Sequence, residues 1–162
     1  MTTTLDDDDF DPPPPPRPPF RRKRVLIPLG LLFAIVLAFL ALRTSDTDRG
    51  AMIAKYGGPN ALFVAGPAGQ RIHYRDQGKR DGPAIVLLHG SNSSLHTWEP
   101  LVKRLGADYR IVTLDLPGHG LTGGTPDGDY SPAGMMAAVD VVAAELSLDT
   151  FILGGNSMGG GI

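Results

Sequence analysis

A serine framed by glycines stands near the end of the sequence, where residues 155–159 read Gly-Asn-Ser-Met-Gly. The apolar run 151–154 precedes it and more glycines follow, which predicts a sharp turn from a strand into a helix. In such a G-x-S-x-G turn the serine hydroxyl lies at the carboxyl end of the strand, and the glycines leave space that a side chain would fill. The first N–H groups of the following helix point to the same place. We therefore predict that Ser157 is a nucleophile and that the N–H of Met158 stabilises an oxyanion.

Two other interpretations of this glycine-rich stretch are a turn without chemistry and a phosphate-binding loop. A Walker loop carries a Lys-Ser or Lys-Thr pair after its second spaced glycine, and this stretch has no such pair. The dinucleotide-binding pattern G-x-G-x-x-G does not fit residues 154–161 either. The nucleophile is the favoured interpretation.

The elements that would position this serine are predicted in residues 57–162. Apolar runs and turn residues indicate strands at 61–65, 71–75, 84–88, 109–114 and 150–153, the first two forming a hairpin. Helical spacing of apolar residues indicates helices over 95–105 and from Pro132 to Leu146, the second with Ser131 as its N-cap. Strands that alternate with helices predict a parallel sheet covered on both faces, so the fold class is α/β.

Ligands bind beyond the carboxyl ends of the strands in such sheets, and three loops of this chain are predicted to lie there. They are residues 89–94, residues 115–120 and the turn at Ser157. An acyl-transfer site needs a nucleophile, N–H donors for the oxyanion, and a base oriented by an acid. The turn at 89–94 can bring N–H groups close to Ser157. The spacings of His89, His96 and His119 match no metal motif, and loop or surface roles are favoured for them, as a structural role is for His73.

Taken together, these loops resemble those of the α/β-hydrolase superfamily. The resemblance rests on His89-Gly90 after a strand, on Asp-x-Pro-Gly-His-Gly at 115–120, and on Gly-Asn-Ser-Met-Gly-Gly at 155–160. It covers about residues 57–162 and implies the amino-terminal half of an α/β-hydrolase sheet, in which the N–H groups of Ser91 and Met158 form the oxyanion hole. It also implies that His89, Asp115 and His119 shape loops and are not triad members.

The same resemblance implies a triad in the order serine, acid, histidine, with the last two far downstream of the serine. The sequence ends at Ile162, so we expect these 162 residues to be the amino-terminal part of a longer hydrolase, unstable and nearly inactive alone. The serine argues against the dehalogenase and epoxide-hydrolase branches, which have Asp in its place at this strand-to-helix turn, the nucleophile elbow. The residues around this serine, Gly-Asn-Ser-Met-Gly-Gly, are shared by esterases and by hydrolases that cleave carbon–carbon bonds. The implied substrate is a small ester, lactone or related carbonyl compound, and no cofactor or metal is implied.

The first part of the chain differs in composition from the rest. Residues 1–24 contain an acidic run, a polyproline stretch and a basic collar, which predicts a disordered tail, with a proline-rich ligand as the less favoured alternative. Residues 25–42 are an uncharged apolar run that would span about 27 Å as a helix, close to the hydrocarbon core of a bilayer. We predict a retained transmembrane anchor rather than a cleaved signal, with Pro28 in its first turn and residues 43–56 as a linker.

The basic collar before residue 25 predicts the orientation of that anchor. By the positive-inside rule the amino terminus stays cytoplasmic and the hydrolase portion lies on the periplasmic or extracellular side. The predicted partners are thus the lipid bilayer, through residues 25–42, and a small-molecule substrate. A formal net charge of −2 argues against nucleic acid, the lack of cysteine excludes thiolate chemistry, and no protein partner is indicated.

Two alternatives to a serine hydrolase remain open at this point. One is a non-catalytic membrane protein in which a partial or decayed hydrolase domain serves only for interaction. The other is an acyltransferase on the same scaffold, in which an alcohol takes the place of water.

Overall fold

The computed structural model describes residues 13, 20–43 and 47–162. It divides into two units, residues 1–46 and residues 47–162. Most of the predicted disordered tail lies outside the described residues.

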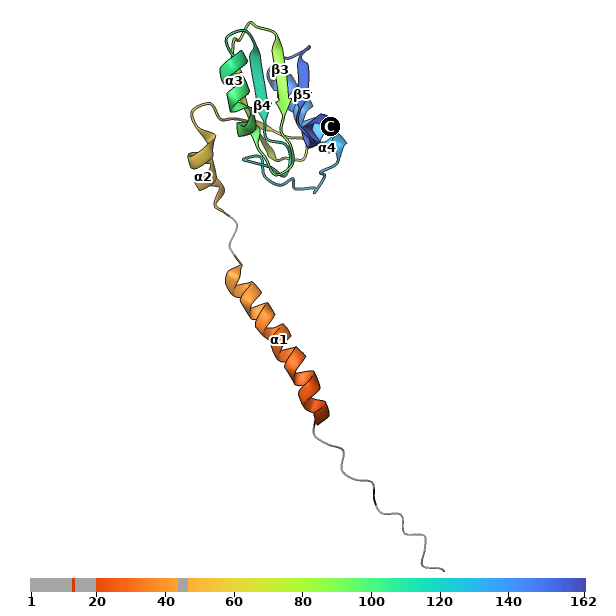
Figure 1. Ribbon diagram of the computed structural model, residues 1–162. Coiled ribbons are helices and arrows are strands. Elements are labelled where there is room, and N and C mark those ends of the chain that lie inside the picture. Colours follow the sequence, from red (N-terminus) through yellow and green to blue (C-terminus); the bar gives the residue numbers. More distant parts are fainter. Residues whose placement is uncertain (1–12, 14–19, 44–46) are drawn as a thin grey trace, which may run out of the picture. The chain divides into compact units, whose positions relative to one another are not determined.

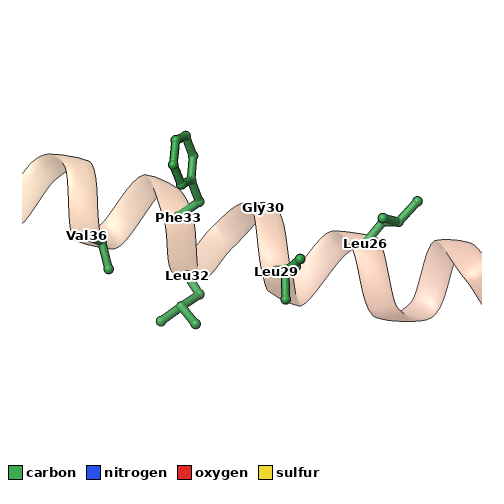
Figure 2. Close-up of a pocket in the computed structure, with 6 residues that line it drawn as sticks. All are labelled: Leu26, Leu29, Gly30, Leu32, Phe33 and Val36. Carbon is green, nitrogen blue, oxygen red and sulfur yellow. The ribbon is translucent and has the colours of Figure 1, made fainter.

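The first unit contains helix α1, Phe20–Leu42, drawn in orange in Figure 1. The apolar run 25–42 is helical as predicted, but the helix begins earlier, in the basic segment, whose Arg and Lys residues are good helix formers. The prediction that Pro28 lies in the first turn was therefore wrong, and this proline is inside the helix. From Leu26 onward the apolar side chains are exposed, and Figure 2 shows several of them projecting from the helix.

Among the helices of the described residues, none combines the length and the apolar character that crossing a membrane requires. The anchor at 25–42 stays a prediction.

The described part of the second unit is built on a five-stranded sheet in the order β1-β2-β4-β3-β5. Figure 1 shows β4, β3 and β5 side by side. The strands are β1 Leu62–Ala65, β2 Arg71–Gly78, β3 Ala84–Leu88, β4 Arg110–Leu114 and β5 Ile152–Gly155. All five predicted strands are present, although β5 is displaced toward the serine and ends at the first elbow glycine. The sheet is mixed and not parallel throughout, because the β1–β2 hairpin joins it with β2 antiparallel to β4. Only β4, β3 and β5 are parallel.

Helices pack against both faces of this sheet. Helix α4, Pro132–Glu145, begins at the predicted N-cap, where the Ser131 hydroxyl accepts a hydrogen bond from the N–H of Gly134 at 3.2 Å. Most of its buried residues pack in one cluster with Val86 and Val112 of the sheet; they are Met135, Ala138, Val139 and Val142. The 3-10 turn η2, Leu95–Trp98, and helix α3, Glu99–Leu105, follow β3. Since side chains alternate along a strand, buried Leu87 faces away from the α4 cluster, on the side of η2 and α3.

The segment before the hairpin was predicted as a linker over 43–56 but is largely helical where it is described. It forms α2, Arg49–Met52, and η1, Ile53–Gly57. Asp48 caps α2 by accepting a hydrogen bond from a backbone N–H at 2.8 Å, a start signal that sequence reasoning missed. Arg75 on β2 then donates hydrogen bonds to two backbone carbonyls of η1, at 3.0 and 3.1 Å. This segment is therefore packed on the domain that it precedes.

Candidate active site

Ser157 stands at the turn between β5 and the short helix α5, Met158–Gly161. Its backbone has φ 51° and ψ −114°, a conformation that is strained for a residue with a side chain. The side chain is exposed. The prediction of a strained strand-to-helix turn at this serine is confirmed.

The glycines on either side of Ser157 leave space that a methyl group would occupy. A Cβ added to Gly155 would collide with the backbone carbonyl of Gly159. A Cβ added to Gly159 would collide with the carbonyl oxygen of Leu88 and would lie 2.7 Å from that of His89. Real Cβ atoms are essentially never that close to backbone atoms. The predicted collision with the turn is thus confirmed for Gly155, whereas a side chain at Gly159 would collide with the end of β3.

The loop after β3, residues 89–94, lies against the turn that carries Ser157. The N–H of Asn156 donates a hydrogen bond to the carbonyl of Leu88 at 3.0 Å. A Cβ added to Gly90 would lie 3.3 Å from the carbonyl oxygen of Asn156 and 3.4 Å from the Cβ of Ser157. The two loops are therefore in contact, as predicted. Ser91 follows Gly90 directly and is exposed, and its role as an oxyanion donor stays a prediction, as does that of Met158.

A buried acid–histidine pair lies beneath these loops. The Nδ1 of His73 on β2 is 2.7 Å from Oδ2 of Asp115, and both side chains are fully buried. Because the carboxylate can only accept, Nδ1 carries the proton. No hydrogen bond in the described part of the chain joins His73 Nε2 to any group, so this histidine is not placed to deprotonate Ser157. Sequence reasoning missed the pair, because its members come from strands far apart in the sequence.

The Asp115 carboxylate also accepts hydrogen bonds from two backbone N–H groups, those of Leu95 and Leu121, each at 2.8 Å. Burial alone would raise the pKa of the Asp115 carboxyl. The hydrogen bonds from His73 and the two backbone groups outweigh burial and hold that pKa below its ordinary value. Asp115 is therefore a buried carboxylate with three donors, and it shapes loops as the resemblance implied.

His89 is neutral, and its hydrogen bonds determine its tautomer. The N–H of Leu116 donates to Nε2 of His89 at 3.1 Å, so Nδ1 carries the proton and donates to the carbonyl of Gly90 at 2.8 Å. Burial lowers the pKa of His89, and the neighbouring His119 lowers it further, whereas the Gly90 carbonyl and Asp115 act in the opposite direction. The buried imidazole thus ties two loops together in its uncharged form.

We expect His89 to make the folded protein less stable in mild acid. Because its pKa is lower in the fold than the value of about 6.5 in an unfolded chain, the unfolded state takes up a proton first as pH falls. Its contribution is complete above about pH 6.5 and is lost as pH falls toward the folded pKa. Urea unfolding of the complete gene product between pH 7.5 and 5 should show a steeper loss of stability than the same measurement on His89→Asn. Parallel pH profiles for the two proteins would contradict this account.

The remaining histidines of the site region make local contacts. His119 Nδ1 is 3.0 Å from the carbonyl oxygen of Pro117, and His96 Nε2 is 3.0 Å from that of Tyr56. Within the described residues, no three His, Asp or Glu side chains converge as metal ligands would. A mostly apolar cavity of about 210 Å³ lies beside the loop 89–94 and is lined by Met52, Tyr56, Ser94, His96, Asp115, Gly120 and Leu121. Its lining includes neither Ser157 nor Ser91, so the cavity by itself is not the place where Ser157 would meet a substrate.

Comparison with known proteins agrees with this geometry. Residues 83–162 match the family model described as the alpha/beta hydrolase fold. An N-formylmaleamate deformylase of Pseudomonas putida is 39% identical over 103 residues, which are 61% of this chain and 38% of that protein. An esterase of Mycobacterium tuberculosis is 35% identical over 78 residues, 48% of this chain and 26% of that protein. The match thus spans well under half the length of either curated relative.

A solved structure gives the same result. The crystal structure of the enol-lactonase from Burkholderia xenovorans LB400 superposes with a TM-score of 0.56 at 30% sequence identity. That superposition covers 60% of this chain and 38% of the enol-lactonase. The family match, the curated relatives, the solved structure and the serine turn against the loop after β3 all agree, and the chain therefore belongs to the α/β-hydrolase family, of which it carries part of a domain.

Proposed function

We propose that the complete gene product is a serine hydrolase that cleaves a small ester, lactone or related carbonyl substrate through an acyl-serine intermediate. One observation carries the proposal: Ser157 stands on a strained turn in contact with the loop that begins at His89. The relatives named deformylase, esterase and enol-lactonase support a hydrolase that acts on carbonyl compounds.

In the proposed reaction the Oγ of Ser157 attacks the carbonyl carbon of the substrate and gives up its proton to a histidine base. The carbonyl oxygen becomes an oxyanion, which the N–H groups of Ser91 and Met158 stabilise. When the intermediate collapses, the bond to the leaving group breaks and the protonated histidine returns its proton to that group. Water, deprotonated by the same histidine, then attacks the acyl-serine. The bond between the acyl carbon and Oγ of Ser157 breaks, the histidine returns its proton to Oγ, and the acid is released.

The base and its orienting acid are proposed to come from parts of the gene product beyond these 162 residues. Among the hydrogen bonds of the described residues, none joins Ser157 to a histidine, and His73 is buried beside Asp115 instead. This assignment follows the chain order of the family's triad, serine then acid then histidine. No cofactor or metal takes part in the proposed steps.

We further propose that residues 25–42 anchor the protein in a bilayer, with the amino terminus cytoplasmic and the hydrolase portion on the periplasmic or extracellular side. The support is the uncharged apolar run itself and the Lys and Arg residues before it.

A reactive-serine probe tests both proposals on the native protein. Cells are separated into soluble and carbonate-washed membrane fractions, each is treated with a fluorophosphonate, and labelled peptides are mapped. We expect the label on Ser157, in the washed membranes, and no label at this position in Ser157→Ala. An unlabelled Ser157 in a folded protein would contradict the hydrolase and favour the non-catalytic alternative, and label in the soluble fraction would contradict the anchor. Product formed with an added alcohol in preference to water would instead identify an acyltransferase.

A further inference from the structure

Asp115, at the carboxyl end of β4, is a junction between three segments of the chain. Its carboxylate accepts hydrogen bonds from His73 on β2, from the N–H of Leu95 at the start of η2, and from the N–H of Leu121. The side chain of Asp115 is fully buried, and its carboxylate lies against Gly120, where an added Cβ would collide with it. Such a buried charge persists only because every one of these donors points at it.

The loop that touches the Ser157 turn is tied to the segment after β4 at both of its ends. At one end, the imidazole of His89 accepts a hydrogen bond from the N–H of Leu116. At the other end, Asp115 Oδ1 accepts the hydrogen bond from the N–H of Leu95. Between the two ties lies Gly90, which packs against Asn156 and Ser157.

We propose that Asp115 is a positioning residue for the oxyanion site, because it holds the far end of the loop 89–95 and thereby sets where the N–H of Ser91 lies relative to Ser157. This inference rests on the proposed function. Among the hydrogen bonds of the described residues, none joins Asp115 to Ser157, and the proposed action of Asp115 is through the loop. An oxyanion donor works only when it is fixed in place before the charge develops, so a loop that is loose at one end loses catalysis more than binding.

The variant Asp115→Asn tests the role of the second carboxylate oxygen with little change in volume. An amide has one acceptor oxygen and one NH2 group. In Asp115→Asn the NH2 group therefore takes the place of one carboxylate oxygen and faces the donors that hydrogen-bond to this oxygen in the unmodified protein. If the NH2 group replaces Oδ1, the N–H of Leu95 loses its acceptor; if it replaces Oδ2, the donors of His73 and Leu121 both lose theirs. Either outcome loosens the junction.

A matched control is Asp76→Asn. Asp76 on β2 is also a buried carboxylate of the sheet, but its partners are Arg80 and Arg110, at the ends of the strands opposite to the loop 89–95. The same chemical change there removes charge and hydrogen bonds without touching the oxyanion loop.

The first measurement is steady-state kinetics of the complete gene product with an ester that it hydrolyses. We expect Asp115→Asn to lower kcat about tenfold to a hundredfold with KM changed less than about threefold, and to weaken inhibition by a boronic acid, which forms an anionic tetrahedral adduct on serine, by a similar factor. Asp76→Asn should keep kcat and boronic acid inhibition within about threefold of the starting protein. An Asp115→Asn protein that is folded and keeps its kcat would overturn the inference.

The second measurement needs no activity and is amide hydrogen exchange by mass spectrometry. We expect the peptide that contains residues 89–95 to exchange at least about tenfold faster in Asp115→Asn, with β3 and β4 unchanged, and no such local change in Asp76→Asn. If Asp115→Asn does not fold, His89→Asn, which removes the tie at the other end, should give the same local signature. Unchanged hydrogen exchange of residues 89–95 in folded Asp115→Asn would contradict the inference, even if Ser157 is the nucleophile. Absence of any Ser157-dependent hydrolysis, with the loop signature present, would instead reject the proposed function alone.

Discussion

Replacement of Ser157 by alanine in the complete gene product should lower kcat/KM for its ester substrate by about four to six orders of magnitude. The hydroxyl is the atom that forms the acyl intermediate, and without it only the oxyanion site and binding can accelerate attack by water. KM should change little, because the substrate carbonyl still meets the same backbone donors. Stopped-flow or steady-state hydrolysis of a chromogenic ester measures the change.

A second variant at the same position separates the reaction from the strain. Ser157→Gly also lacks the hydroxyl and should be equally inactive, but glycine adopts φ 51° and ψ −114° without the penalty that a Cβ brings. We expect its free energy of unfolding to exceed that of Ser157→Ala by about 1 kcal/mol in urea titrations. Hydrolysis by either variant at the rate of the unmodified protein would remove Ser157 from the mechanism. Equal stability of the two variants would mean that the turn stores no strain.

Replacement of Gly159 by alanine adds a single methyl group to the turn at Ser157 and should be strongly damaging. The added Cβ would meet the carbonyl oxygens of Leu88 and His89, which are backbone atoms at the end of β3 and cannot turn aside as a side chain can. We expect a loss of about 3 kcal/mol of stability, the upper end of the usual cost of overpacking. Because the displaced carbonyls open the loop that begins at His89, catalysis should fall by about a hundredfold even where the protein folds.

The matched control is Gly161→Ala, in the same short helix. Among the described residues, no atom lies within 4 Å of a Cβ added at Gly161, so the same substitution should leave stability within about 0.5 kcal/mol and activity unchanged. Urea unfolding and ester hydrolysis, measured on both variants, decide the prediction. If Gly159→Ala were as stable and as active as Gly161→Ala, the close packing of α5 on the end of β3 would be wrong.

Local features of the fold could be predicted because they depend on short stretches of sequence. The continuous apolar run at residues 84–88 becomes β3 with the predicted bounds, and Ser131 followed by a proline begins α4 where predicted. The helical segment before the hairpin was missed although Asp48 caps it, because its length gives no apolar periodicity and Arg75, which holds it to β2, is distant in the chain.

The edge of the sheet and the directions of its strands depend on pairing between segments that are distant in the chain. In the described sheet β5 pairs only with β3. Its Ile152 and Leu153 are 57% and 45% exposed. The mixed direction of the strands was missed, because a hairpin predicts only how its own two strands pair, and the pairing of β2 with β4 joins segments far apart in the chain.

The sequence alone indicates which chemistry is available. It shows a serine with a glycine two residues to either side after a strand, a loop containing Gly90 after the apolar strand at 84–88, and an apolar run near the amino terminus. These are properties of neighbouring residues. The collision that demands glycine at 155 is also within the turn, whereas the collision at Gly159 is with the carbonyls of Leu88 and His89 at the end of β3. Tertiary structure decided which distant groups meet. Asp115 receives its donors from His73, Leu95 and Leu121, and the tautomer of His89 depends on Leu116, because the folded sheet brings the ends of β2, β3 and β4 to one edge. Burial removes water from that edge, so each buried polar group must find its partner in the protein.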